Sequence, residues 1–117
     1  MRRDRGSSHG TGAARGEGAG SRATGEVVGS SVPVSSLKRY TGHTLGACGA
    51  LEAWLSIEMM RQGWFHPTAN LENPDPECGD LDYVTGEGRE LDCEFTMSNN
   101  FAFGGINTSL IFRRWPA

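Results

Sequence analysis

The aromatic residues of this 117-residue chain are confined to its second part, and this limits most strongly what the chain can fold into. Every Trp, Tyr and Phe lies in residues 37–117, whereas residues 1–36 hold eight of the 17 glycines and mostly Ala and Val as apolar side chains. Aromatic side chains contribute a large share of the buried apolar area in a small core. A core can therefore form only from residues 37–117, and the length suits a single domain.

The composition also argues against two classes of function. The mean hydropathy is −0.43, and no stretch of about 18 apolar residues is present, which argues against a membrane-spanning protein. The formal net charge of −3 argues against a basic groove for nucleic acid. Cys48, Cys78 and Cys93 show no paired spacing, and no signal peptide precedes them, so we expect free thiols and a cytoplasmic location.

The local sequence patterns predict a layered α/β fold with one long helix. Residues 1–26 show no apolar periodicity and are expected to be a degenerate, poorly ordered segment, which leaves residues 27–117 as the domain proper. Within residues 26–29 the sequence resembles a helix end with a glycine stop, and residues 32–36 favour a strand.

The long helix is predicted over residues 44–62. Its apolar residues occupy most of its circumference and residues 46–50 are all small, which indicates a buried central helix that approaches other backbone closely. Gly63 stands where a helix C-cap is common. Two prolines in residues 70–76 then predict an ordered surface loop.

The end of the chain predicts an antiparallel β-hairpin. Apolar and polar residues alternate over residues 91–99, as in a strand, and residues 107–114 favour a second strand. Between them, residues 101–105 read Phe-Ala-Phe-Gly-Gly, a turn signal.

Two histidines stand in polar, glycine-flanked settings, His9 and His43. A neutral imidazole can donate from one nitrogen while a partner fixes the other, which suits proton transfer and oxyanion stabilisation. For His43, before the long helix, a structural cap is an equally good interpretation. For His9, an exposed tail residue is the better interpretation from composition alone.

Lys38 and Glu52 are a candidate ion pair. Glu52 is one of the few charged residues of a largely apolar helix, and a buried carboxylate needs a partner. The alternative places Glu52 on a solvated stripe together with Ser56.

The turn at residues 101–105 could supply an oxyanion-hole N–H group, or it could be an ordinary hairpin with two hydrophobic plugs. The residues His66, Cys78 and Cys93 have no recognised metal-ligand spacing, and we predict no metal site.

Several of these segments together resemble one family, the elongating β-ketoacyl-ACP synthases, which are condensing enzymes of the thiolase fold. The resemblance runs without a gap over about residues 27–115, and the family's His-Gly-Thr motif falls on His9, Gly10 and Thr11. The segments that carry it are residues 32–36, 38–47, 70–76, 98–105 and 107–112. The resemblance implies that the chain is the C-terminal part of a thiolase-like fold.

The resemblance also implies roles for individual residues. His9 and His43 match the two histidines that bind the malonyl thioester carbonyl and stabilise its enolate. Lys38 and Glu52 match the buried charged pair that organises the histidines. Phe103 matches the gating aromatic, whose backbone N–H joins the oxyanion hole. Thr11 and Phe101 are the two residues expected to bind the substrate.

The implied reaction is a decarboxylative condensation of acyl groups with malonyl-ACP, in fatty acid or polyketide-type elongation. It needs no metal or redox cofactor, and its substrates are carried on the phosphopantetheine arm of acyl carrier protein. The implied partners are acyl carrier protein and a second synthase chain, in a homodimer or with a partner subunit. The family's nucleophilic cysteine lies upstream of the His-Gly-Thr motif, so Cys48, Cys78 and Cys93 do not match it.

From these features we expect a chain that is inactive alone and that exposes apolar surface. Two alternatives remain open at this point. The chain could be a non-catalytic subunit similar to the chain-length partners of synthases, or a truncated gene product.

Overall fold

The computed structural model describes residues 5–7, 14–73, 75–76, 78–102 and 104–116. A five-stranded sheet has the order β4-β2-β1-β6-β7, in which only the β6–β7 pair is antiparallel. A separate antiparallel ribbon joins β3 to β5. The helices are α1 (Ala14–Val28), α2 (Lys38–Thr41) and α3 (Cys48–Gln62), and the strands are β1 (Arg5–Ser7), β2 (Pro33–Ser35), β3 (Trp64–Phe65), β4 (Asp82–Tyr83), β5 (Arg89–Glu90), β6 (Phe95–Phe101) and β7 (Asn107–Arg113).

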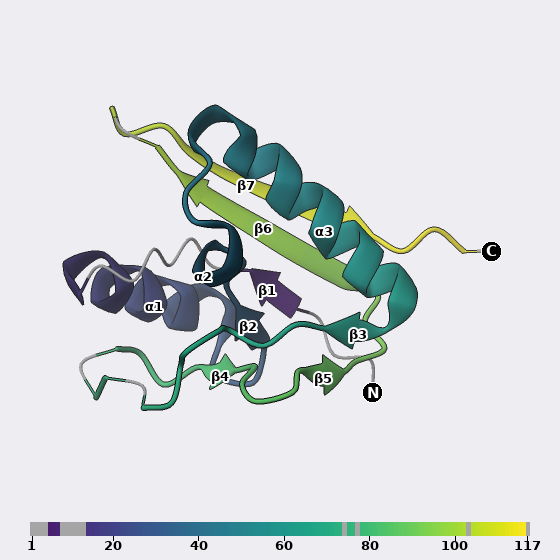
Figure 1. Cartoon of the computed structure of the whole chain (residues 1–117), viewed down its shortest axis with the longest axis horizontal. Helices are drawn as coiled ribbons and strands as arrows, with labels where there is room; N and C mark the ends of the chain where they lie inside the picture. Colours follow the sequence, from purple (N-terminus) through teal and green to yellow (C-terminus); the bar gives the residue numbers. More distant parts are fainter. Residues whose placement is uncertain (1–4, 8–13, 74, 77, 103, 117) are drawn as a thin grey trace.

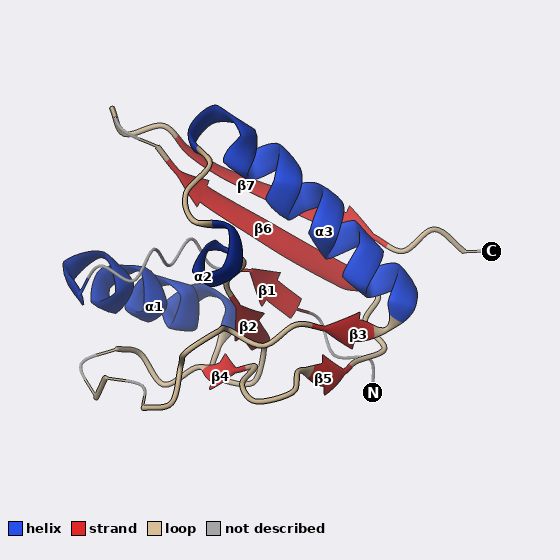
Figure 2. Cartoon of the chain, in the orientation of Figure 1, coloured by secondary structure: helices blue, strands red, loops and turns tan. Residues whose placement is uncertain are grey.

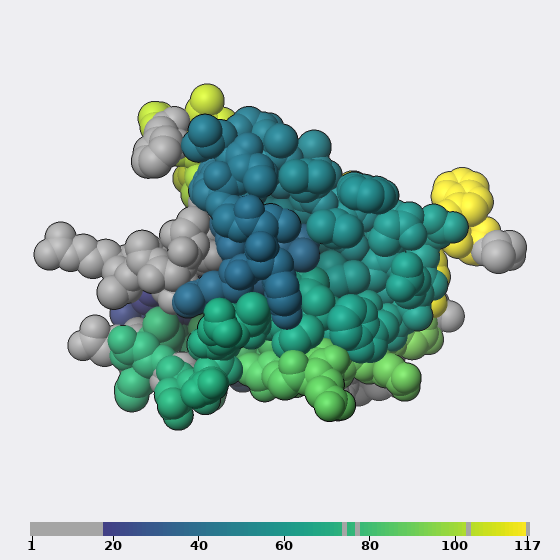
Figure 3. Space-filling model, in the orientation of Figure 1, coloured from purple at the N-terminus to yellow at the C-terminus, as the bar shows by residue number. Residues whose placement is uncertain are grey.

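The helices are distributed over the two faces of the sheet. Figure 2 shows α3 running along β6 and β7, with the short α2 near β1 and a connecting segment leading from α2 to the start of α3. In the space-filling view, α2 and α3 cover much of the near face (Figure 3). The fold is thus layered α/β, as the sequence predicts.

The N-terminal segment differs from its expected disorder, since β1 lies at the centre of the sheet and α1 fills residues 14–28. Propensity alone disfavours a glycine-rich helix, but tertiary packing can override it. Ser21 is buried, and its hydroxyl accepts a hydrogen bond from the Gly79 N–H at 3.0 Å. The small residues of α1 therefore allow a close contact with the loop before β4. The division of the chain at residue 26 remains a prediction.

The expected helix ends are confirmed. Helix α1 ends at Val28, and Gly29 follows with φ of 78° and donates its N–H to the Gly25 carbonyl at 2.9 Å. Helix α3 ends at Gln62, and Gly63 has φ of 69°, in the left-handed region that glycine adopts without strain.

Helix α3 is buried on one face only, in contrast to the predicted central position. Its C-terminal half packs Met59 and Met60 against Phe65, Leu91 and Cys93. Residues between the buried positions are half-buried, and the exposed residues of the helix include Trp54, whose side chain is 58% exposed. Within the described residues one side of this helix packs on the core and the other contacts solvent. The expected exposed apolar surface is therefore present.

The C-terminal hairpin is confirmed, but its first strand begins four residues later than predicted. Strand β6 starts at Phe95 and pairs with β7 from Phe95↔Arg113 to Phe101↔Asn107. Its fully buried side chains are the polar Thr96 and Ser98, whereas Phe95 is only half-buried. The alternation of apolar and polar residues therefore predicted the position of this strand, but not which of its two faces is buried.

The described residues contain no helix that is both long and apolar enough to span a membrane. The cysteines Cys48, Cys78 and Cys93 all carry free thiols, as predicted.

The close approach of α1 to the loop at Gly79 gives a prediction for stability. A Cβ atom at Gly79 would lie 2.9 Å from the Ser21 carbonyl oxygen, and backbone cannot move aside easily. We expect Gly79→Ala to lower the free energy of unfolding by about 1–3 kcal/mol, measured by chemical denaturation. The matched control is Gly20→Ala on α1, where a Cβ meets nothing within 4 Å. This control should raise stability by about 0.5–1 kcal/mol, and equal effects at the two positions would contradict the packing.

Candidate active site

Lys38 and Glu52 form an ion pair in the interior of the protein. Lys38 is the first residue of α2 and Glu52 lies in the second turn of α3, and the Lys38 ammonium contacts Glu52 Oε1. Their side chains are only 1% and 4% exposed. The predicted pairing is confirmed, and the alternative of a solvated stripe is wrong because Ser56 is also fully buried.

A third group completes this pair. The Cys48 thiol, one helical turn before Glu52, donates to the same Oε1 atom at 3.5 Å. The thiol is buried at 4% exposure, so its environment is that of a packing residue that also orients a carboxylate. The i, i+4 spacing of residues 48 and 52 on a helix could have indicated this contact.

His43 lies in the turn that joins α2 to α3, and its ring is held by backbone. The Leu45 N–H donates to His43 Nδ1 at 3.1 Å. Because Nδ1 accepts this hydrogen bond, it carries no proton, and the neutral ring carries its proton on Nε2. The ring thus accepts a hydrogen bond from the first residue of the short 3₁₀ helix Leu45–Ala47, as the capping interpretation predicts.

This turn has an unusual backbone. Gly42, at the C-terminal end of α2, has φ of 68°, and Leu45 has φ of 52°, which is uncommon for a residue with a Cβ atom. For a residue with a Cβ atom such a conformation stores strain, and strained residues concentrate at functional sites. The strained peptide at Leu45 is the one that directs its N–H toward the imidazole.

The turn after β6 is closed by its own backbone. Phe101 ends the strand and is 44% exposed, and Ala102 donates its N–H to the Ile106 carbonyl at 2.9 Å. Gly104 and Gly105 have φ of 88° and 84°, and Gly105 donates to the Ala102 carbonyl at 3.2 Å. The predicted glycine turn is confirmed, and Phe103, for which the resemblance implies a gating role, lies outside the described residues.

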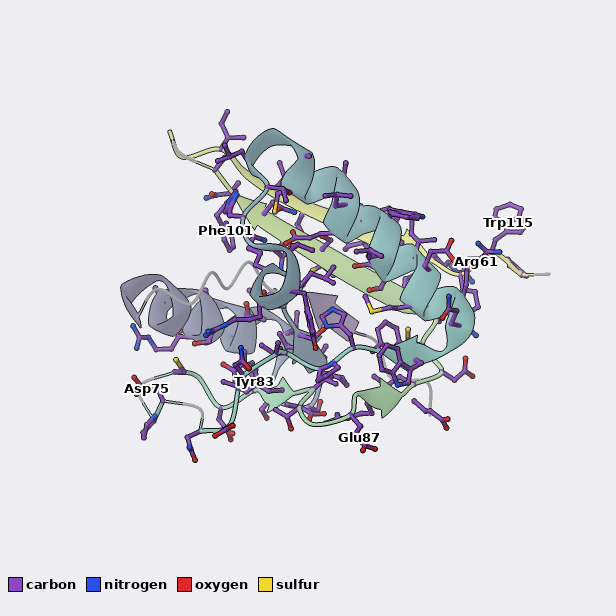
Figure 4. All side chains as sticks on the ribbon, viewed as in Figure 1. Arg61, Asp75, Tyr83, Glu87, Phe101 and Trp115 are labelled. Atoms are coloured by element: carbon purple, nitrogen blue, oxygen red, sulfur yellow. The ribbon has the colours of Figure 1, made fainter. Side chains whose placement is uncertain are left out.

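The start of α3 and the end of β6 lie together. A Cβ atom added to Gly49 would be 3.6 Å from the Asn100 side-chain nitrogen, which is ordinary contact distance. Figure 4 shows Phe101 at this end of the sheet, with Arg61 and Trp115 at the opposite end. The fold therefore gathers the Lys38–Glu52 pair, the His43 turn and the Phe101 turn in one region, whereas His9 and Thr11 lie outside the described residues.

A further histidine, His66, is buried outside the predicted site. His66 is only 8% exposed; its Nδ1 lies 2.7 Å from the Pro67 carbonyl oxygen and its Nε2 lies 3.5 Å from Ser35 Oγ. The Tyr40 ring stands edge-on to it, with centroids 5.4 Å apart. These contacts join β2 and α2 to the segment after β3.

The described residues contain no group of three His, Cys, Asp or Glu side chains placed to hold a metal ion.

Comparisons with known proteins place the chain in a family. Residues 6–72, more than half of the chain, match the model of the β-ketoacyl synthase C-terminal domain. The 3-oxoacyl-[acyl-carrier-protein] synthase 2 of Synechocystis sp. is 42% identical over 110 residues, 92% of this chain, and its counterpart in Coxiella burnetii is 52% identical over 81 residues, 69% of this chain.

Solved structures show the same arrangement. A β-ketoacyl synthase from Burkholderia phymatum matches 97% of this chain with a TM-score of 0.94 and 59% identity, over 28% of its own length. A ketosynthase in complex with its chain length factor from Xenorhabdus doucetiae matches 92% of this chain with a TM-score of 0.80 and 34% identity, over 27% of its own length.

The chain belongs to the β-ketoacyl synthase family and carries its C-terminal domain. The predicted fold, the C-terminal part of a thiolase-like fold, is confirmed. The chain spans 26% and 19% of the two curated relatives, so it corresponds to about a quarter or less of a full-length synthase.

The buried ion pair gives a prediction for stability. Lys38→Met leaves the Glu52 carboxylate buried without its cation, and we expect a loss of about 3–5 kcal/mol in the free energy of unfolding. The double variant Lys38→Met/Glu52→Leu removes both charges and should recover most of that loss. Chemical denaturation of the two variants measures both effects.

The control for that experiment is the exposed pair Arg61–Glu58, at 2.8 Å on the same helix. Arg61→Met should change stability by less than about 1 kcal/mol, because exposed pairs contribute little. A double variant as unstable as Lys38→Met would show that packing, and not the unpaired charge, causes the loss.

Proposed function

We propose that this chain supplies the malonyl-decarboxylating half of a β-ketoacyl synthase active site. The observation that carries the proposal is the His43 ring, whose Nδ1 accepts the Leu45 N–H and whose Nε2 therefore carries the proton. A neutral imidazole with a fixed donor nitrogen suits the oxygen of a thioester carbonyl, which becomes negative when an enolate forms.

In the proposed reaction, an acyl group is held as a thioester on a cysteine of the family's upstream part. Malonyl-ACP loses its carboxylate as CO₂, and the electron pair of the broken C–C bond forms the enolate of acetyl-ACP. The enolate carbon attacks the acyl carbonyl, forms the new C–C bond and releases the cysteine thiolate. His43 and His9 stabilise the enolate oxygen, as their match to the family's two histidines implies.

The other predicted residues act around this step. The Lys38–Glu52 pair holds α2 against α3 and so fixes the turn that carries His43. The backbone N–H of Phe103 would join the oxyanion hole for the acyl group, while Phe101 and Thr11 would contact the substrate. Two of the thiols, Cys48 and Cys93, are buried and unsuited to attack a substrate, in keeping with a nucleophile supplied by another segment.

The proposed substrates are carried by acyl carrier protein, and no bound cofactor or metal is needed. One solved complex contains a chain that is 29% identical to this one, with a TM-score of 0.87. The complex is that of a type II PKS acyl-carrier protein with its ketosynthase bound to the hexaketide. By analogy, acyl carrier protein and a second synthase chain are the proposed partners of this protein.

Reconstitution tests the proposal. The 117-residue chain alone should release no β-ketoacyl product from acyl-ACP and malonyl-ACP. Combined with the nucleophile-bearing part of the Synechocystis relative, it should support CO₂ release and condensation. His43→Ala should lower the condensation rate by about 10²–10³-fold, because one oxyanion donor is removed. Arg61→Gln, at the far end of α3, is the control and should leave the rate unchanged.

Two results would contradict this proposal. Condensation by the chain alone, surviving replacement of Cys48, Cys78 and Cys93, would show that no separate nucleophile is required. The chain could instead associate stably with a full-length synthase while His43→Ala leaves the condensation rate of the complex unchanged. That result would favour the alternative that the chain is a non-catalytic chain-length partner.

A further inference from the structure

Helix α2 is a single turn of four residues, Lys38–Thr41, and it leads directly into the turn that carries His43. An isolated helical turn is not stable by itself, so contacts with neighbouring elements must hold it in place. The Lys38–Glu52 pair supplies one such contact, with α3. A single attachment would leave so short a helix free to pivot about that contact.

Tyr40 supplies a second attachment, on the opposite side of α2. Successive residues of a helix are about 100° apart, so the side chains of residues 38 and 40 leave the helix about 200° apart. The Tyr40 hydroxyl donates to the Pro67 carbonyl at 2.8 Å. The segment that leaves β3 and contains Pro67 passes between α2 and β4 (Figure 1). Helix α2 is therefore attached to α3 on one side and to the segment after β3 on the other.

The segment after β3 is itself held firmly on both sides of Pro67. Before it, Phe65 is fully buried in the apolar core. After it, the Thr68 N–H donates to the Val84 carbonyl at 2.8 Å, and the Thr68 hydroxyl accepts the Ser36 N–H at 3.1 Å. The Pro67 carbonyl therefore has a fixed position between the core and two neighbouring strands.

His66 provides a fixed surface for the Tyr40 ring. Its Nδ1 lies 2.7 Å from the Pro67 carbonyl oxygen, which can only accept, so Nδ1 carries a proton and donates it to this bond. The Tyr40 ring stands edge-on to the imidazole, at an interplanar angle of 89°, a favourable arrangement of two rings. His66 is 8% exposed, whereas Tyr40 is 53% exposed. The buried histidine therefore limits the movement of a tyrosine that lies at the surface.

We propose that Tyr40 is a positioning residue for His43. Its hydroxyl fixes the orientation of α2, and the turn that carries His43 begins where α2 ends. A displacement of about 1 Å is enough to lower the contribution of a catalytic group. The inference rests on the proposed function of His43, and it adds two residues, Tyr40 and His66, to which the family resemblance gives no role.

Tyr40→Phe tests the attachment in the 117-residue chain itself. The variant keeps the ring against His66 and removes only the hydroxyl. Loss of one hydrogen bond changes a local opening equilibrium roughly fivefold, so amide hydrogen exchange at Gly42 and Leu45 should accelerate by about that factor. Exchange at Met60, in the core part of α3, should stay unchanged. Unchanged exchange at Gly42 and Leu45 would overturn the proposal, and equal acceleration at all three amides would do so too, because it would show general destabilisation.

The matched control is the other tyrosine of the chain, Tyr83 in β4. Tyr83→Phe removes a hydroxyl of the same kind from a strand that does not lead into the His43 turn. Exchange at Gly42 and Leu45 should be the same in this variant as in the wild-type chain. Acceleration equal to that of Tyr40→Phe would contradict a specific attachment through Tyr40.

The reconstituted synthase tests the effect on catalysis. Tyr40→Phe should lower the kcat of condensation roughly threefold to fivefold and change the KM for malonyl-ACP by less than about twofold, because the donor to the enolate is displaced while the binding surface remains. In the His43→Ala background, Tyr40→Phe should have no further effect, since a residue that acts through His43 then has nothing to position. Losses that multiply in the double variant would overturn the proposal.

The two experiments separate this inference from the proposed function. If His43→Ala leaves the condensation rate unchanged, the proposed function fails, and hydrogen exchange in the chain alone still decides whether Tyr40 holds the His43 turn. If His43→Ala lowers the rate and Tyr40→Phe does not, the proposed function stands and the positioning role of Tyr40 is overturned.

Discussion

The buried contact between the Lys38 ammonium and the Glu52 carboxylate is the constraint on which the rest of this structure depends. Neither charge could remain in the interior alone, because desolvation of an isolated ion costs far more than a packed side chain gains. The two charges therefore hold the short helix α2 to α3 in one arrangement. The turn between these helices carries His43, so the ion pair joins the two ends of the segment in which the imidazole lies.

Much of the fold could be predicted because its main signals are local. Glycine at a helix end and a glycine turn between two strands each determine local backbone, and both lie where the sequence indicates. The long helix ends at the predicted residue but begins at Cys48, because residues 45–47 form a 3₁₀ helix. Helix α1 could not be predicted in this way. Its stability depends on contact with Gly79, 58 residues beyond Ser21, and local propensity contains no trace of such a contact.

The candidate site could be predicted in part for the same reason. The Lys38–Glu52 pair follows from the rule that a carboxylate on an apolar helix needs a cation, and the structure confirms it. The burial of His66, Ser56 and Thr96 could not be predicted from the sequence. Hydroxyl and imidazole side chains occur both at the surface and in the interior, and their location depends on the partners that the fold provides. Sequence spacing alone also could not decide whether His43 caps a helix or donates to a substrate; the structure shows the Leu45 N–H donating to its Nδ1, and its role toward a substrate remains a proposal.

The backbone at Leu45 has a consequence for how this site tolerates sequence change. The group that orients the imidazole is a main-chain N–H, which every residue except proline provides. Position 45 is therefore restricted by conformation and not by side-chain chemistry: with φ of 52°, it suits residues that accept the left-handed region, such as glycine or asparagine. A change of side chain at position 45 therefore leaves the orientation of the imidazole unchanged as long as the new residue accepts this backbone conformation.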